Sequence, residues 1–142
     1  MGDAGSQFIG CFVAYFSIEN LWNSAVDLGQ TPWYGVLVVL VAFTPAAADT
    51  LTVVINRLRR GQSPMVGGKD HTTHHLVYAG LTDWKVWYVF VIIGLLASVL
   101  AVVMVNLMKL HATVPLVFFG LYSIVVFILL YRNTIKYPAP KK

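Results

Sequence analysis

Charged residues are scarce in this sequence, and cysteine is almost absent. Only 11% of the 142 residues are charged, whereas 58% are hydrophobic and the mean hydropathy is +0.72. An ordinary soluble domain carries about 25% charged residues, so this composition excludes a water-soluble globule. The high apolar content also excludes a disordered chain. The single cysteine, Cys11, excludes an intramolecular disulfide and any multi-cysteine zinc or iron–sulfur site.

The charge-free stretches predict where the chain crosses a membrane. No charge occurs in 86–108 or in 110–131, and a helix needs roughly 20 apolar residues to span the hydrocarbon core. Two further apolar stretches precede these, one of which contains the acid Asp49, and we expect Pro45 to kink that helix. The predicted fold is an all-α integral membrane protein with about four transmembrane helices in a single membrane domain. The predicted spans are 6–22, 33–55, 86–108 and 114–131, and the loop between the second and third is 56–85.

The distribution of basic residues predicts the orientation. Nine of the ten lysines and arginines lie either in the loop 56–85 or in the C-terminal tail. In a four-span chain these two segments face the same side of the membrane, which the positive-inside rule makes the cytoplasmic side. Asp3, which precedes the first predicted span, then lies on the cytoplasmic side as well.

The loop 56–85 combines three kinds of residue that bind phosphate. Guanidinium groups match phosphate oxygens, glycines let backbone N–H groups approach an anion, and histidine binds metals, donates to phosphate or moves protons. The candidate substrate-binding and catalytic residues of the loop are Arg57, Arg59, Arg60, Gly67, Gly68, His71, His74 and His75. Together they indicate a phosphate-bearing substrate at the membrane surface. The alternative is that the arginines only anchor lipid headgroups and set the topology.

Two acids outside this loop are further candidates. Asp3 lies between two glycines at a predicted membrane entrance, where one carboxylate and substrate phosphates are a typical Mg²⁺ environment. The alternative is a helix cap. Asp49 lies inside a predicted span, which makes it a functional candidate, although pairing with Arg57 or Arg60 would also account for it.

Four motifs, in this order, resemble those of the polyprenyl-phosphate N-acetylhexosamine-1-phosphate transferases, an integral-membrane family. Residues 1–6 are similar to the family's M-G-D-x-G-S element, and 45–50 are similar to its P-x-x-D-T helix with one extra residue. Residues 59–64 resemble its R-x-G-R-S-P run, and 74–76 resemble the end of its H-x-H-H-x-L motif. The family's first histidine falls here on Thr72, so His71 matches only by proximity.

The resemblance implies a reaction and the residues that carry it. Family members transfer N-acetylhexosamine-1-phosphate from a UDP-sugar to polyprenyl (undecaprenyl) phosphate with release of UMP, which initiates cell-envelope glycan assembly such as that of lipopolysaccharide. By carry-over, Asp3 is a catalytic ligand of Mg²⁺, with Mn²⁺ as a substitute. His74 and His75 are catalytic groups that bind the pyrophosphate or uridylyl group, while His71, the loop arginines and the loop glycines bind substrate.

The resemblance also implies partners and a location. The expected partners are a UDP-N-acetylhexosamine, a polyprenyl phosphate lipid and the membrane, with no nucleic acid. The oligomeric state is open, and a homodimer is among the arrangements it allows. The expected location is the bacterial inner (plasma) membrane, with a multi-pass topology and a cytoplasmic active face.

The chain departs from the family in length, and other functions stay open. Family members are longer, and their N-terminal half supplies an Asp-Asp pair that this sequence lacks. We therefore expect the C-terminal portion of a larger transferase, inactive alone. One alternative is a non-catalytic membrane fragment or subunit. Another is a membrane di-iron oxygenase, because 71–75 reads H-x-x-H-H, although such enzymes need several such boxes and the one other histidine is His111.

Overall fold

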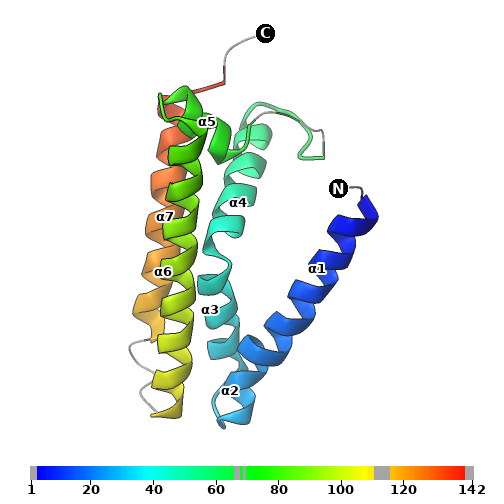
Figure 1. Ribbon diagram of the computed structural model, residues 1–142, viewed down its shortest axis with the longest axis vertical. Coiled ribbons are helices and arrows are strands. Elements are labelled where there is room, and N and C mark those ends of the chain that lie inside the picture. The colour runs from blue at the N-terminus through cyan, green and yellow to red at the C-terminus, as the bar shows by residue number, and fades with distance from the viewer. Residues whose placement is uncertain (1–2, 66–67, 69, 111–115, 140–142) are drawn as a thin grey trace. The chain divides into compact units, whose positions relative to one another are not determined.

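The computed structural model describes residues 3–65, 68, 70–110 and 116–139, and the regular structure within them is entirely helical. The helices, in chain order, are α1 (Asp3–Ser17), the π-helix η1 (Ile18–Trp22), α2 (Asn23–Asp27), α3 (Pro32–Ala42), α4 (Thr44–Arg59), α5 (Thr72–Tyr78), α6 (Asp83–Lys109) and α7 (Leu116–Lys136) (Figure 1). This confirms the predicted all-α class. The chain divides into two compact units, Met1–Ala42 with Ser98–Gly120 and Phe43–Ala97 with Leu121–Lys142, which are described separately.

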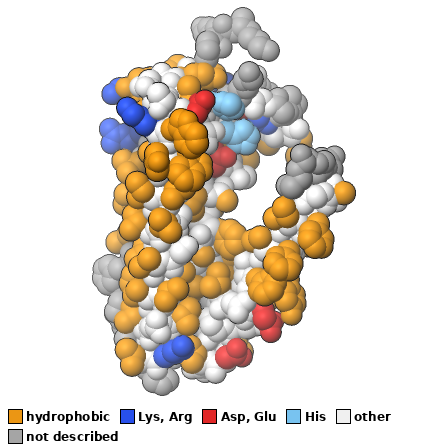
Figure 2. All heavy atoms as spheres, in the orientation of Figure 1, with side chains coloured by type: hydrophobic (Ala, Val, Ile, Leu, Met, Phe, Trp, Pro, Cys, Tyr) orange, Lys and Arg blue, Asp and Glu red, His pale blue; other side chains and the backbone are white. Residues whose placement is uncertain are grey.

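Two of the described helices are long and apolar enough to cross a membrane. They are Asp83–Lys109, which is α6, and Phe119–Lys136, which is most of α7. They correspond to the predicted spans 86–108 and 114–131, of which 114 and 115 lie outside the described residues. Apolar side chains cover much of the visible surface (Figure 2), as expected for helices that face lipid. The structure therefore supports a helical membrane protein.

The predicted span 33–55 is broken into two helices. α3 ends at Ala42 and α4 begins at Thr44, and neither helix alone is long enough to cross a membrane. The described residues therefore contain two candidate spans, or three if the bent pair of α3 and α4 forms one span. Pro45 lies in the first turn of α4, where its missing N–H costs no helical hydrogen bond. The expected interruption of this helix by Pro45 therefore occurs at the start of α4.

The predicted span 6–22 corresponds to α1 followed directly by η1. α1 has 15 residues, fewer than the roughly 20 that cross a hydrocarbon core, so a span at 6–22 stays a prediction. Phe8, Phe12 and Phe16 follow one another along α1 at a spacing of four residues, and all three are exposed. This apolar stripe suits a helix in contact with lipid or with another apolar surface.

Close backbone contact holds the first unit together. A Cβ atom at Gly35 in α3 would lie 2.4 Å from the carbonyl oxygen of Trp22 in η1, so only glycine permits the two helices to approach this far. Ala25 of α2 and Val38 and Val41 of α3 belong to the same unit and are fully buried. Met104 and Met108 of α6 belong to the same unit and are also fully buried, so small, β-branched and methionine side chains form its core.

The second unit packs α4, the first half of α6 and α7 from Leu121 onward together. Ala48 of α4 and Val126 and Leu130 of α7 form a buried cluster. The partly buried side chains packed against this cluster are Leu76, Phe90, Ile93, Tyr122 and Phe127. Because Leu76 belongs to α5, the apolar core of the helices also fixes the short helix that carries two of the candidate histidines.

Hydrogen bonds between side chains set the register of the helices in the second unit. The hydroxyls of Thr44 in α4 and Ser123 in α7 lie 2.6 Å apart. Toward the other end of α4, Asn56 Nδ2 donates to Thr134 Oγ1 of α7 at 2.9 Å. Between helices in lipid such bonds add specificity to packing that the hydrophobic effect drives only weakly. The bond between Asn56 and Thr134 brings the C-terminal ends of α4 and α7 together, where the helices carry Arg57, Arg59, Arg132 and Lys136.

Candidate functional site

The short helix α5 presents one of its two candidate histidines to the interior. His75 is buried, and its Nδ1 lies 2.7 Å from the carbonyl oxygen of Tyr137, just beyond α7. A carbonyl only accepts hydrogen bonds, so Nδ1 carries the proton and the lone pair of the neutral ring is on Nε2. The ring also meets Tyr78 edge to face at 5.6 Å. His75 therefore docks α5 on the end of α7, and Nε2 is the ring nitrogen that this contact does not use.

His74 has a different environment from its neighbour. Successive residues on a helix point about 100° apart, so His74 cannot share the contacts of His75. It is partly exposed, and its ring makes no hydrogen bond that the structure records to the described residues. The predicted histidine pair thus consists of one buried ring that docks α5 and one partly exposed ring.

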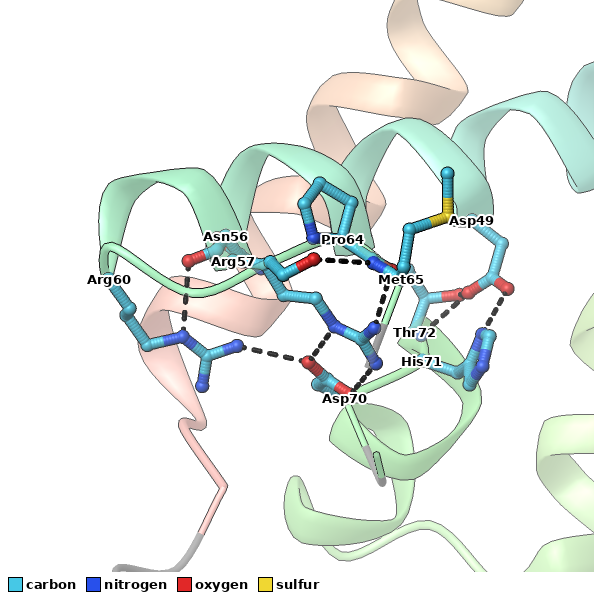
Figure 3. Close-up of polar contacts among 10 residues, drawn as sticks. Asp49, Asn56, Arg57, Arg60, Pro64, Met65, Asp70, His71 and Thr72 are labelled. Carbon is cyan, nitrogen blue, oxygen red and sulfur yellow. Dashed lines mark hydrogen bonds and ion pairs between the residues drawn. The ribbon is translucent and has the colours of Figure 1, made fainter. Parts of the chain in front are cut away.

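Arg57 holds the loop instead of opening toward solvent. Its Nε and Nη2 atoms donate to the two carboxylate oxygens of Asp70, both at 2.7 Å, and Nη1 donates to the carbonyl oxygen of Pro64 at 2.8 Å (Figure 3). Both side chains are buried. This bidentate geometry is the strongest form of ion pair, and the Arg57 guanidinium holds the pKa of Asp70 below its usual value. Arg57, predicted to bind substrate, is therefore occupied by its own loop.

Gly68, one of the two loop glycines predicted to bind an anion, lies beside the carboxylate of Asp70. A Cβ atom at Gly68 would lie 2.5 Å from Asp70 Oδ1 and 3.2 Å from Arg57 Nη2. Gly68 does let an anion come close, as its small size predicts, but the anion in this structure is the protein's own carboxylate. Gly67 lies outside the described residues.

Arg59 and Arg60 are the more exposed members of the arginine group. Arg59 Nη1 donates to the hydroxyl of Tyr131 in α7. Arg60 Nη2 donates to Asp70 Oδ2 at 3.2 Å and Nε donates to the carbonyl oxygen of Asn56, while 46% of the side chain remains exposed. These two arginines keep surface through which an anion can reach them.

Asp49 pairs with α5 and not with the arginines. Its Oδ1 accepts hydrogen bonds from the backbone N–H and the hydroxyl of Thr72, at 2.7 and 2.6 Å, and its Oδ2 lies 2.8 Å from His71 Nδ1 (Figure 3). The suggested pairing with Arg57 or Arg60 is wrong for a geometric reason. Arg57 lies eight residues further along α4, about 12 Å from Asp49 along the helix axis. The loop folds back so that Asp70, and not Asp49, lies beside Arg57.

Asp70 and Thr72 are the residues of the candidate site that the sequence did not single out. Asp70 is the only acid between the arginines and the histidines of the loop. That isolation is a signal, because a single acid among many bases is the expected partner of one of them. Thr72 carried no comparable signal, since a hydroxyl at the start of a helix is common.

The structure describes only part of the predicted metal site. Asp3 begins α1 in the first unit, and its side chain lies outside the described part of the chain, while the histidines belong to the second unit. Among the described residues, no three His, Cys, Asp or Glu side chains come together to hold a metal ion. Asp49 and Asp70 are both engaged by neighbouring side chains. Since Mg²⁺ commonly takes one or two carboxylates together with substrate phosphates, Asp3 remains a chemically suitable ligand.

Sequence comparison connects this chain with known transferases. It is 32% identical over 101 residues to the undecaprenyl-phosphate alpha-N-acetylglucosaminyl 1-phosphate transferases of Salmonella typhi and of Escherichia coli strain K12, an alignment that covers 71% of this chain and 25% of each relative. It is 25% identical over 127 residues to the probable undecaprenyl-phosphate N-acetylglucosaminyl 1-phosphate transferase of Bacillus subtilis, with 89% of this chain and 32% of the relative covered. No protein-family model matches the chain, and no solved structure matches it significantly.

The matches extend over most of this chain but over a small part of each relative. The chain spans about a quarter to a third of the length of the curated relatives it matches. The predicted family resemblance is thereby confirmed at a distant level. The chain is a distant member of the family of undecaprenyl-phosphate N-acetylglucosaminyl 1-phosphate transferases.

Proposed function

We propose that this chain supplies part of the site of an enzyme that transfers N-acetylglucosamine-1-phosphate, or a related N-acetylhexosamine-1-phosphate, from its UDP-sugar to undecaprenyl phosphate. The observation that carries the proposal is the 32% identity over 101 residues to proteins named for this transfer. Because the alignment covers 25% of those relatives, the whole activity is proposed for a protein in which this chain is one part. The product would initiate a cell-envelope glycan such as lipopolysaccharide.

The geometry of the second unit supports a phosphate-handling role. Residues 57–60 at the end of α4 and 71–75 at the start of α5 include three arginines and three histidines, and His71 and Arg60 are half exposed. Imidazole and guanidinium groups are suited to phosphate oxygens. Apolar helices lead away from this end of the unit, which suits a substrate that is a lipid with a phosphate headgroup.

In the proposed reaction an oxygen of the lipid phosphate attacks the β-phosphorus of the UDP-sugar. A P–O bond forms to the lipid, the P–O bond to the bridging oxygen breaks, and UMP leaves with that oxygen. Phosphoryl transfer depends mainly on alignment and charge neutralisation. We assign His74 and His75 Nε2 to the pyrophosphate, and Arg59 and Arg60 to the attraction of the phosphates. Arg57 acts indirectly, by holding the loop.

A divalent cation is part of the proposal. Mg²⁺, or Mn²⁺ in its place, would neutralise pyrophosphate charge, with Asp3 as its ligand from this chain. The expected setting is a bacterial inner membrane with the loop on the cytoplasmic side, as the basic residues indicate. A homodimer is compatible with this arrangement.

The competing proposal is a membrane subunit without catalysis of its own. The observation in its favour is that the chain matches only about a quarter of the length of the named transferases. In that case the phosphate-binding loop would serve recognition or assembly. Measuring sugar-phosphate transfer by the chain alone and by the product of the longest open reading frame that contains it distinguishes the two proposals.

The test is transfer of labelled sugar phosphate into lipid. Membranes with the longer protein, incubated with radiolabelled UDP-N-acetylglucosamine, undecaprenyl phosphate and Mg²⁺, should yield label in the organic phase, and a chelator should remove it. Asp3→Asn should abolish transfer, whereas Asp27→Asn, at an exposed position of α2, should leave it unchanged. Absence of label, or full activity of Asp3→Asn, would overturn the proposal or the metal assignment respectively.

A further inference from the structure

One carboxylate links the middle of α4 to an exposed imidazole. Asp49 Oδ2 and His71 Nδ1 lie 2.8 Å apart, and 51% of the His71 side chain but only 22% of the Asp49 side chain is exposed. The acid is therefore the sheltered partner and the ring is the accessible one. In this arrangement a sheltered carboxylate orients an exposed histidine ring toward a ligand.

The contact determines which ring nitrogen is available. An ionised carboxylate only accepts hydrogen bonds, so Nδ1 of His71 carries the proton that points at Asp49. In the neutral ring Nε2 then holds the lone pair, and in the protonated ring Nε2–H is the donor that remains. His75 likewise has its Nδ1 on a protein acceptor, the carbonyl oxygen of Tyr137, but its ring is buried, so of these two rings His71 is the exposed one.

The same carboxylate also fixes the start of α5. His71 occupies the position before the first helical residue and makes no cap with its own side chain. Asp49 Oδ1 instead accepts from the backbone N–H and hydroxyl of Thr72, which satisfies a donor that helix starts leave unpaired. Asp49 thus uses one oxygen for the helix and the other for the ring. A carboxylate needed only as a cap would not require the second contact.

We propose that Asp49 is a positioning residue, which sets the tautomer and direction of His71 so that His71 Nε2 meets a phosphate oxygen of the substrate. The inference rests on the proposed function for its substrate class and deepens it. The phosphate belongs either to the nucleotide or to the lipid, and both present the same oxyanion to Nε2. Asp49 does not touch the phosphate, and it acts through His71 and α5.

The first test reads the tautomer directly and needs no activity. The chain, labelled with ¹⁵N-histidine and held in detergent micelles at pH 9, is examined by long-range ¹H–¹⁵N correlation, and His71→Gln assigns the ring. The expected result is a protonated Nδ1 and an unprotonated Nε2. Asp49→Asn should reverse this tautomer, because the amide then donates to Nδ1.

The control for this test is Thr72→Val. It removes one of the hydrogen bonds to Asp49 Oδ1 but leaves the contact of Oδ2 with His71 in place, so the tautomer should not change. A protonated Nε2 in the unaltered chain, or the same tautomer in Asp49→Asn, would overturn the proposal. These outcomes stand whether or not transferase activity is found, so failure of the proposed function is distinguished from failure of this inference.

The second test uses the active membrane protein and separates the two phosphates. Asp49→Asn should raise the KM for one phosphate substrate about tenfold, which is the scale of one charge-assisted hydrogen bond, and Asp49→Glu should restore part of the loss. A change in KM for the UDP-sugar identifies the nucleotide, and a change in KM for undecaprenyl phosphate identifies the lipid. Asp83→Asn, an exposed acid at the start of α6, is the matched control. A fall in kcat alone, with both KM values unchanged, would contradict the assignment.

Discussion

Asp70 and Asp49 anchor the same loop, and they do so in opposite ways. Asp70 is buried and receives three hydrogen bonds from two arginines. Asp49 receives two from Thr72 and pairs on its other side with a half-exposed imidazole. In the first cluster both oxygens of a buried carboxylate accept hydrogen bonds from guanidinium groups. The second leaves a titratable ring in contact with solvent.

The difference in burial between the Asp70 and Asp49 contacts separates residues that stabilise the loop from residues that bind a ligand. Removing one partner of a buried ion pair leaves an uncompensated charge, which is costly even when the intact pair contributes little net stability. Removing a partner of an exposed pair costs little, since water replaces it. We therefore expect changes at the Asp70 cluster, which is the buried pair of Arg57 and Asp70, to affect folding of the loop. Changes at Asp49 and His71 should affect mainly what the loop binds.

The largest effect is expected from Asp70→Asn. The amide keeps one acceptor but loses the charge, so Arg57 remains buried without an anion. We expect a loss of about 2 kcal/mol in the free energy of unfolding and faster proteolysis in 61–70. Unfolding in detergent and limited proteolysis measure the two. Asp83→Asn should change neither, and equal protease sensitivity in both variants would show that the Asp70 cluster does not hold the loop.

Acid should weaken the same cluster in a defined pH range. The pKa of Asp70 lies below its ordinary value of 3.8, mainly because of the hydrogen bonds from Arg57. The carboxylate therefore contributes its full stabilisation above 3.8 and loses it as the pH falls through the lower folded value. The difference in stability between the unaltered chain and Asp70→Asn should be constant from pH 8 to pH 5 and shrink only in stronger acid. A difference that already shrinks near pH 6 would require another titrating group.

A smaller effect is expected from Gly68→Ala. The new methyl group would lie 2.5 Å from Asp70 Oδ1, so either the carboxylate or the loop must shift. Because two hydrogen bonds from Arg57 hold the carboxylate, we expect a loss of about 1 kcal/mol in unfolding free energy. Gly10→Ala, which meets nothing within 4 Å, is the matched control in a helix. If Asp70→Asn abolishes the penalty of Gly68→Ala, the clash is with the charged pair.

The smallest effect on stability is expected from Arg60→Gln. This guanidinium is 46% exposed and its contact with Asp70 is 3.2 Å, so the loss should be about 0.5 kcal/mol or less. Substrate phosphate should nevertheless bind more weakly if Arg60 attracts it. Measuring the free energy of unfolding and the KM for the phosphate substrate on the same preparation separates the effect on stability from the effect on binding. A large loss of stability with unchanged KM would move Arg60 into the structural cluster.

Much of the helical framework follows from local sequence. The charge-free stretches predict α6 and α7 because a long apolar run has no alternative to a helix in lipid. The interruption near Pro45 follows from proline's missing N–H and fixed φ. The division of 6–22 into α1 and a π-helix was not predictable, since π-helical turns depend on packing and have no strong sequence signature.

The candidate site was predictable in its residue types but not in its pairings. His74, His75 and Arg60 could be singled out because imidazole and guanidinium groups cluster in one loop. The assignment of Arg57 as a substrate-binding residue did not foresee its contact with Asp70. A charged side chain in a loop has several partners of the right sign, and the backbone path decides among them.

Composition and short spacings were enough to predict the helical membrane class, the family and the concentration of basic and imidazole groups in one loop. The pairing of Asp70 with Arg57, 13 residues away, and of Asp49 with His71, 22 residues away, became known only from the folded chain. Electrostatic energy depends on distance in space and on burial. Both are set by how the loop folds back onto α4.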